Sequence, residues 1–546
     1  MTHESISEKY PIFDKDSFIR LMLSNIEYNS SSEERAREYL VEEGLDPESI
    51  VAKGLARIKE ITLRNKPQET NQSLAKPRVN VEHFVRKRTW SHRSVLRLIQ
   101  ESQNSDPIEE IKRRARALVL SAFEKGWQGP PYDPVQLAEL LGIGIVPNDS
   151  VLDARIVPQK KGYQIQYNPF QRPTRVNFSI SHEIAHTLFS DCAEAVRNRE
   201  NEPMENRELE QLCNAAAAEI QLPYAVFSHD ANAAEPSVEG LIELAKKYKA
   251  SLESVFIRYA EVIDMPCAIL IGIFQNEDKI IIDYHKTSRL FDLKIPDNLT
   301  IPKESKAYES TTPGWTARER IEWDAFQNKP YNLFTVGISP YRRDKKPRVA
   351  MLILPTESYN LSPETGKISL EFGDATKPRG KGKKIICQVV NTSAALGRGF
   401  GYSLTKNYPI VKEELKKWQA KKSEFVLGSS NLIKISDELF VFQMLAQKGL
   451  FPNRGEIPLK YKELHKCLIE LRETALELEC SIHMPAIGSG NAGGDWNIII
   501  GMIHDELVNY DLDVNIYLFQ GKPFNPKEKT TLTLFKEDST WEKGKS

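Results

Sequence analysis

The sequence lacks paired cysteines, long apolar runs and a net charge, and each absence excludes a class of protein. Its six cysteines are scattered without a CxxC pair, which predicts reduced, mostly buried thiols and no cysteine metal site. No apolar run approaches the ~20 residues that a membrane helix needs, and the N-terminus has no basic start followed by an apolar core. A net charge of −1 argues against a chain-wide electrostatic grip on nucleic acid or anionic membranes. We therefore expect a cytoplasmic protein with no membrane contact and no direct nucleic-acid binding.

What is present is an ordinary globular composition on a long chain. The 546 residues, 40% hydrophobic and 27% charged, exceed what one hydrophobic core holds, so we expect several domains. Local patterns predict a multidomain fold of the α+β and α/β classes. The predicted parts are a helical N-terminal region (1–105), a helix-rich domain with short strands (106–265), a β-rich connector (266–365), an alternating α/β domain (366–522) and a polar tail (523–546).

Short sequence signals support this division. Asp106 and Asp133 each precede a proline and predict capped helix starts. "VRKRTWSHRSVLR" (85–97) could contact phosphates, but it reads better as a solvated basic segment beside a domain boundary. Apolar strand-like runs such as "CAILIGIF" and "KIIIDYH" begin after residue 266, and strands alternate with helices after 366.

The segment "NFSISHEIAHTLFSD" (177–191) carries two histidines four apart. On a helix, His182 and His186 share one face, with Glu183 beside them. Two imidazoles at this spacing can hold Zn²⁺, and the glutamate can take a proton from water as a carbonyl is attacked. The ligand types suit zinc best, while manganese and iron remain compatible. The alternative is a surface helix with two unconnected histidines.

A catalytic zinc needs a third protein ligand and one open position. The segment "ENRELEQLCNAAAAEIQLP" (205–223) predicts a second helix, on which Glu210 and Asn214 lie four apart and away from the apolar face. We predict Glu210 as the third ligand and Asn214 as a partner that holds a ligand in place. Rival carboxylates, otherwise solvated charges, are Glu205, Glu208 and Glu219.

Together, "PYDPVQLAELLGIGIV" (131–146), "HEIAH" and "ELEQLCNAAAAEIQLP" (208–223) resemble the ImmA/IrrE family of zinc metallopeptidases. The resemblance implies a zincin-like domain over 106–265 and a protein substrate, a regulator or toxin-like target, in stress, DNA-damage or phage response. Cys213 and Ala216 depart from the alanine and phenylalanine that are usual there, and we expect neither to touch the metal.

Two glycine-rich loops follow apolar strands in the C-terminal α/β domain. They are "VVNTSAALGRGFGYSL" (389–404) and "MPAIGSGNAGGDW" (484–496). Glycines allow backbone N–H groups to converge on phosphate oxygens without an intervening Cβ. The two loops together predict a groove for a diphosphate.

With "GDAT" (373–376) and "FQMLAQKG" (442–449), these loops resemble a macro domain, the ADP-ribose-binding fold. The resemblance implies an ADP-ribose-type ligand, with Asp374 at the adenine amino group and Asn391 at the distal ribose. Lys448 and Asp495 could serve hydrolysis of ADP-ribose links, but we favour binding. The implied binding residues are Asp374, Ala375, Asn391, Gly397, Arg398, Gly399, Phe400, Gln447, Gly488, Ser489, Gly490, Asn491, Ala492 and Gly493.

The leading functional prediction is a zinc-dependent peptidase that cleaves a specific protein and is controlled by an ADP-ribose-like ligand. In one alternative, the macro domain only recruits the peptidase to ADP-ribosylated targets. In another, the macro domain removes ADP-ribose and the metal site is structural. The connector at 266–365 has no predicted role.

Overall fold

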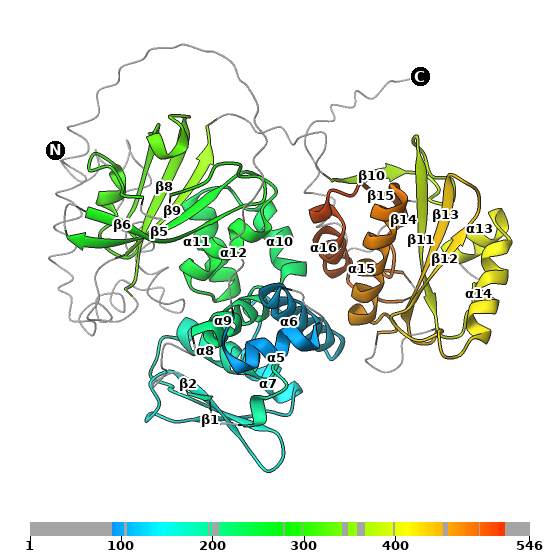
Figure 1. The fold of residues 1–546 in the computed structure, drawn as a ribbon, viewed down its shortest axis with the longest axis horizontal. Coiled ribbons are helices and arrows are strands. Elements are labelled where there is room, and N and C mark those ends of the chain that lie inside the picture. The colour runs from blue at the N-terminus through cyan, green and yellow to red at the C-terminus, as the bar shows by residue number, and fades with distance from the viewer. Residues whose placement is uncertain are drawn as a thin grey trace, which may run out of the picture.

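The computed structural model describes residues 90–102, 106–194, 197–198, 207–276, 279–296, 299–340, 348–356, 366–396, 399–450, 457–490 and 492–518. In this part of the chain, helices and three separate sheets form the predicted mixture of α+β and α/β architecture (Figure 1). The predictions for residues 1–89, Glu205, Gly397, Arg398, Asn491 and the tail at 523–546 lie outside the described residues.

The first unit combines helices with a small sheet in the order β1-β3-β2-β4. Asp106 and Asp133 accept hydrogen bonds from Ile108 N and Val135 N, each at 2.8 Å, so both predicted helix caps are confirmed. The elements are α5 (Arg93–Glu101), α6 (Pro107–Glu124), α7 (Pro134–Leu140), β1 (Gly144–Pro147), β2 (Ala154–Pro158), β3 (Tyr163–Tyr167), α8 (Pro173–His186), β4 (Arg197–Asn198), α9 (Arg207–Gln221), α10 (Tyr224–Ala233), α11 (Val238–Tyr248) and α12 (Leu252–Val262).

Residues 90–97 of the predicted solvated basic segment (85–97) lead into helix α5, on which the side chains of Arg93 and Arg97 reach solvent. Val95 and Leu98 are buried in the same core as α6, and Trp90 packs against that core. The carboxylate of Glu208 accepts the backbone N–H of His92 at 2.7 Å and so ties the start of α5 to α9. Helical spacing places Arg93 and Arg97 outward and Val95 and Leu98 inward, and this buried face decides where the helix lies.

The connector forms a five-stranded antiparallel sheet in the order β6-β5-β9-β8-β7. Its strands are β5 (Ala268–Asn276), β6 (Lys279–Thr287), β7 (Thr316–Ile321), β8 (Tyr331–Ile338) and β9 (Arg348–Pro355). One core lies within this unit, and the other face of the sheet joins the core shared with α11 and α12. The buried guanidinium of Arg348 pairs with Glu253 of α12, which also accepts from the hydroxyl of Tyr284. A buried charge pair at this seam fixes the sheet on the helical unit.

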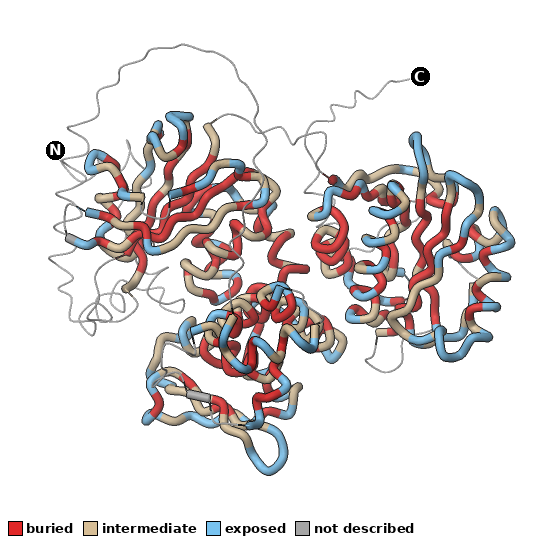
Figure 2. The backbone as a smooth tube through the Cα atoms, viewed as in Figure 1, coloured by how far each residue is buried: buried red, intermediate tan, exposed pale blue. Residues whose placement is uncertain are grey.

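The third sheet has the order β10-β15-β14-β11-β13-β12, parallel except for β12. Its strands are β10 (Ile368–Phe372), β11 (Lys383–Asn391), β12 (Ser430–Lys434), β13 (Leu439–Gln447), β14 (Cys480–Pro485) and β15 (Val514–Leu518). Helices α13 (Gly399–Asn407) and α14 (Ile410–Ala420) cover one face, and α15 (Tyr461–Leu478) and α16 (Trp496–Glu506) cover the other (Figure 1). This is an α/β layer structure with both sheet faces buried (Figure 2).

No helix in the described part of the chain combines the length and the apolar character that crossing a bilayer requires.

Candidate metal centre and nucleotide groove

Helices α8 and α9 pack against each other and present the predicted metal-binding side chains between them. The opposite face of α8 buries Ile180 and Ile184 completely in the core. His182, Glu183 and His186 are all nearly inaccessible, with 0%, 2% and 2% of their surface exposed. Burial of three polar side chains on one helix is costly unless they are bonded or bind an ion.

The carboxylate of Glu210 lies directly between the two imidazoles. Its Oε2 is 3.0 Å from Nε2 of His182, and its Oε1 is 3.6 Å from Nε2 of His186. The two rings meet edge to face with centroids 5.0 Å apart. The structure thus brings together the three side chains that the sequence predicted as a metal-binding set.

Each histidine has a different partner at its second ring nitrogen. Oδ1 of Asn214 lies 3.0 Å from Nδ1 of His182, and Sγ of Cys213 lies 3.2 Å from Nδ1 of His186. With the carboxamide oxygen as acceptor, Nδ1 of His182 carries the proton and Nε2 keeps its lone pair toward Glu210. Cys213, for which no role was predicted, therefore contacts His186 in the way that Asn214 contacts His182.

The rival carboxylates that the structure describes are engaged elsewhere. Glu208 accepts the backbone N–H of His92, the residue that precedes α5. Glu219 is buried and accepts from Arg258 at 2.6 Å and from the backbone N–H of Tyr224 at 2.9 Å. Neighbouring guanidinium groups keep the pKa of Glu219 below its usual value although burial alone would raise it.

The donor set fits a tetrahedral cation. Ligand distances of ~2.0–2.2 Å around zinc place neighbouring donor atoms roughly 3.3–3.6 Å apart, close to the 3.0 and 3.6 Å between the glutamate oxygens and the two Nε2 atoms. His182, His186 and Cys213 also cluster within metal-binding range. However, Sγ of Cys213 contacts Nδ1 of His186, whereas Glu210 approaches Nε2 of both rings, so Cys213 suits an orienting role better than a ligand role.

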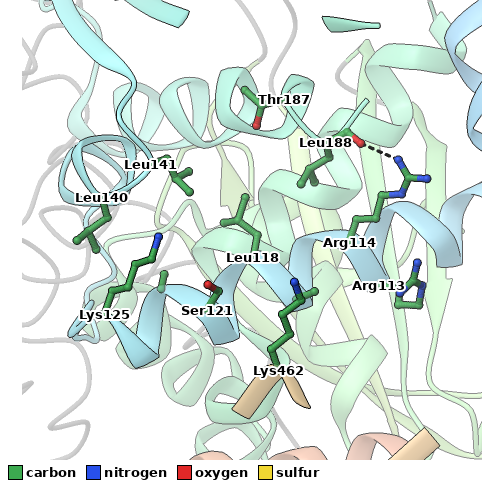
Figure 3. Close-up of a pocket in the computed structure, with 12 residues that line it drawn as sticks. Arg113, Arg114, Leu118, Ser121, Lys125, Leu140, Leu141, Thr187, Leu188 and Lys462 are labelled. Carbon is green, nitrogen blue, oxygen red and sulfur yellow. Dashed lines mark hydrogen bonds between the residues drawn. The ribbon is translucent and has the colours of Figure 1, made fainter. Parts of the chain in front are cut away.

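A pocket of about 450 Å³ lies apart from these donors, between α6, the ends of α7 and α8, and the start of α15 (Figure 3). None of the three predicted ligands lines it. Leu118 and Leu188 supply apolar surface, while Lys125 of α6 and Lys462 of α15 reach toward it from two domains (Figure 3). The pocket therefore marks the seam between the helical unit and the third sheet, not the metal centre.

The predicted nucleotide-binding segments meet at one edge of the third sheet. Strands β11 and β14 are adjacent and parallel, so the loops that follow them leave from the same edge. The first loop leads to α13 on one face and the second leads to α16 on the other face. In open α/β sheets, ligands bind at the carboxyl ends of the strands where connections diverge in this way.

The second loop is held by its own backbone. Gly493 N–H donates to the carbonyl of Gly490 at 3.0 Å, and Gly494 N–H donates to the carbonyl of Gly488 at 2.9 Å. Gly488 and Gly493 have φ of 72° and 70°, values that side-chain-bearing residues rarely adopt. A Cβ on Gly490 would meet no other atom within 4 Å, so the backbone is open to a ligand there.

Two residues of the groove hold their own loops. Asn391 accepts from the backbone N–H groups of Ser393 and Ala395 at 3.1 and 3.2 Å. Asp374 accepts from the backbone N–H of Thr376 at 2.9 Å, directly after β10. Ala375 is buried beside it.

The remaining described residues of the predicted set lie at or after the ends of β11, β13 and β14. Gln447 is buried at the end of β13 and donates to the carbonyl of Gly449 at 3.0 Å. Ser489 donates to the carbonyl of Ala486 at 2.9 Å, and Phe400 packs against the α13 side of the sheet. Gly399 opens α13, and Ala492 is buried. Asp495, considered for hydrolysis, instead caps α16 by accepting from the backbone N–H of Asn497 at 2.9 Å.

A helix-borne HExxH pair with a glutamate from a neighbouring helix is the arrangement of a metallopeptidase domain. Residues 141–259 match the family model of Peptidase_M78, the IrrE N-terminal-like domain. This part of the chain is therefore similar to a metallopeptidase domain of the IrrE type. The radiation response metalloprotease IrrE of Deinococcus radiodurans is 34% identical over 109 residues, which cover 19% of this chain and 32% of that relative.

Solved structures similar to this chain include macrodomains. A macrodomain protein from Streptomyces coelicolor is 29% identical and is covered to 99%, against 28% of this chain, with a TM-score of 0.25. Thermosipho africanus DarTG in complex with ADP-ribose is 21% identical and is covered to 46%, against 32% of this chain, with a TM-score of 0.25.

Proposed function

We propose that this chain is a zinc-dependent peptidase that cleaves a specific regulatory or target protein, under control of an ADP-ribose-like ligand bound to residues 366–522. The observation that carries the peptidase proposal is the convergence of Glu210 on the Nε2 atoms of His182 and His186. A protein substrate of narrow choice, in stress, DNA-damage or phage response, is part of the same proposal.

The proposed chemistry assigns one task to each side chain. Zinc bound here would polarise the attacking water and the scissile carbonyl. His182, His186 and Glu210 would hold the ion. Glu183 would accept the proton of the attacking water and return it to the leaving amine. Asn214 and Cys213 would keep the two rings oriented.

The nucleotide part of the proposal is supported by the groove at the edge of the third sheet. Open glycine backbone at Gly490 and the positive φ values at Gly488 and Gly493 suit an approaching phosphate. The acceptor Asp374 after β10 suits the amino group of an adenine. Because Asp495 is used as a helix cap, binding is favoured over hydrolysis.

The test compares the wild-type chain with Glu183→Gln, which should keep the metal and lose the base. We expect the wild type to generate a small set of new N-termini in a bacterial extract, in a chelator-sensitive manner. Glu183→Gln should bind zinc equally and cut 10²–10⁴-fold more slowly. Glu239→Gln, an exposed glutamate on α11, is the matched control and should cut like the wild type. Equal cleavage by the wild type and Glu183→Gln would overturn the proposal.

Control by the ligand is tested on the first substrate identified in that way. Cleavage rates with and without saturating ADP-ribose should differ several-fold. If ADP-ribose binds and the rate is unchanged, while deletion of 366–522 also leaves cleavage of free substrate intact, recruitment replaces control. If Glu183→Gln retains the full biological effect of the chain and cleavage is absent, the macro domain is the active part.

A further inference from the structure

Helix α16 links the nucleotide loop directly to the metallopeptidase unit. The loop at 488–494 runs into α16, whose first turn is capped by Asp495. Six residues later, Gly501 lies on the backbone of α10, where a Cβ would come within 1.9 Å of the carbonyl oxygen of Ala225. Backbone-to-backbone packing leaves no slack at this crossing, so α16 and α10 are expected to move together.

A series of ion pairs connects α16 to α9. Asp505 of α16 pairs with Arg116 of α6 at 2.8 Å, and Arg116 also reaches Glu219 of α9 at 3.3 Å. Arg258 of α12 holds the same carboxylate at 2.6 Å. Asp505 and Glu219 are buried and Arg116 is partly buried, so removing one partner leaves another poorly compensated in a region of low dielectric.

This series of ion pairs ends on α9, the helix that carries Glu210 and Asn214 of the metal centre. Glu219 belongs to α9, which also carries Glu210 and Asn214. A rotation or shift of α9 would move Glu210 relative to the two histidines on α8. Asp505 of α16 is therefore joined to the helix that carries Glu210 through Arg116 and Glu219.

Further contacts hold the same seam together. Nε2 of His504 is 2.9 Å from Oδ2 of Asp264, and Asn509 donates to the hydroxyl of Tyr224 at 2.5 Å. On the other side of the seam, Glu124 of α6 accepts the backbone N–H of Lys462 at the start of α15, at 3.1 Å. The two units therefore meet through α15 and α16 together, which supports transmission over free rotation.

We infer that Asp505 is a positioning residue for the metallopeptidase centre and that α16 carries the state of the nucleotide loop to α9 through Arg116 and Glu219. The inference rests on the proposed function, because it assumes that zinc binds at the α8–α9 centre and ADP-ribose binds at the loop. A ligand that fixes the loop fixes the start of α16 and, through Asp505, the position of Glu210.

Linkage provides a test that needs no peptide substrate. If the two sites are coupled, zinc changes the affinity for ADP-ribose by the same factor by which ADP-ribose changes the affinity for zinc. We expect a factor of about five or more in the full-length chain, measured by calorimetry with zinc-loaded and chelator-treated protein. Hydrogen exchange across α9 should change with ADP-ribose in parallel.

Asp505→Asn should bring this factor to about one while the zinc-free protein still binds ADP-ribose normally. Asp505→Glu keeps the charge and should restore part of the factor. Arg116→Lys is a second variant, because a point charge cannot serve Asp505 and Glu219 as a guanidinium does. Asp437→Asn changes an exposed carboxylate that pairs only with Lys434 among the described residues, and it should retain the wild-type factor.

The outcomes distinguish failure of the Asp505 inference from failure of the proposed function. The inference is overturned if Asp505→Asn and Arg116→Lys both keep the coupling factor of the wild type. It is also overturned if the wild type binds both ligands with a coupling factor of one. Either result leaves the peptidase proposal standing. Failure of the wild type to bind zinc, or to bind ADP-ribose, overturns the proposed function itself.

Discussion

The carboxamide oxygen of Asn214 on α9 lies 3.0 Å from Nδ1 of His182 on α8. This contact decides which ring nitrogen carries the proton and directs the other toward Glu210. Partners of this kind raise metal affinity by fixing the orientation and tautomer of a ligand histidine. We therefore predict that Asn214→Ala lowers zinc affinity about 10–100-fold without unfolding the chain.

Zinc affinity can be measured by competition with a chromophoric chelator. Gln211→Ala is the matched control, since Gln211 lies exposed on the same helix. Asn214→Asp retains an acceptor oxygen and should keep most of the affinity. Unchanged affinity in Asn214→Ala would remove the orienting role from Asn214.

Cys213 provides a second prediction, since its sulfur lies 3.2 Å from Nδ1 of His186 and is completely buried. If Cys213 orients this ring, Cys213→Ser should preserve zinc affinity and Cys213→Ala should lower it by about tenfold. The cobalt-substituted protein distinguishes this role from direct ligation. The wild type should lack the charge-transfer absorption of a cobalt–thiolate bond, and a band that disappears in Cys213→Ala would instead make Cys213 a ligand.

These two residues show how far the sequence predicted the site. The positions of His182, His186 and Glu210 follow from helical spacing, because residues four apart share a face whatever surrounds the helix. Cys213 was instead counted with the apolar face of its helix and as a departure from a family pattern that does not touch the metal. It lies three residues after Glu210 and next to Asn214, so the same spacing could have placed it on the metal side of α9.

Other features depend on partners that are distant in the sequence. Whether Glu208, Glu210 or Glu219 faces the histidines is decided by what lies opposite each carboxylate. His92, the imidazoles and Arg258 are those partners, and only the fold brings them there. The pairing of Asp505 with Arg116 joins residues almost 400 positions apart, for which local periodicity has no signal.

Strands were predicted well where apolar runs were long, as in β5 and β6. The order of strands was not predicted, because it depends on how crossovers place each strand beside another. The divergence of the loops after β11 and β14, which creates the groove, is a property of that order.

The groove itself yields a third prediction, at Asp374. Its Oδ1 accepts from the backbone N–H and hydroxyl of Thr376 at 2.9 and 2.8 Å, so the carboxylate is held in place for its other oxygen to meet a ligand. Loss of a hydrogen bond to a charged group costs about 1.5–3 kcal/mol, so Asp374→Ala should weaken ADP-ribose binding roughly 10–100-fold. Asp374→Asn should lose less, because its remaining oxygen can still accept. Calorimetry with ADP-ribose measures both, and full affinity in Asp374→Ala would place the adenine elsewhere.

The last prediction concerns His483, which is buried in β14 between Ser481 and Tyr517. Its Nε2 lies 2.9 Å from the Ser481 hydroxyl, and its Nδ1 lies 3.1 Å from the Tyr517 hydroxyl. Burial is the main cause that lowers the pKa of His483 to about 4, with a smaller contribution from Lys384. The folded chain therefore binds the proton more weakly than the unfolded chain, whose histidine pKa is about 6.5.

The sign of the effect follows from linkage. The stabilisation is present above pH ~6.5 and is lost as the pH falls toward the folded pKa. Between pH 7.5 and 5.0, the loss from His483 should approach about 2 kcal/mol. Between pH 7.5 and 5.0, Asp505 changes the free energy of unfolding in the opposite direction, because burial raises its pKa to about 6. The pH dependence of the wild type alone therefore does not separate the contribution of His483. The difference between the wild type and His483→Gln does isolate it. Native-state hydrogen exchange of the β11 and β14 amides, corrected for intrinsic rates, measures the free energy of opening. As the pH is lowered, this free energy should decrease less steeply in His483→Gln than in the wild type. Parallel curves for the two proteins would mean that His483 is protonated as readily in the fold as in water.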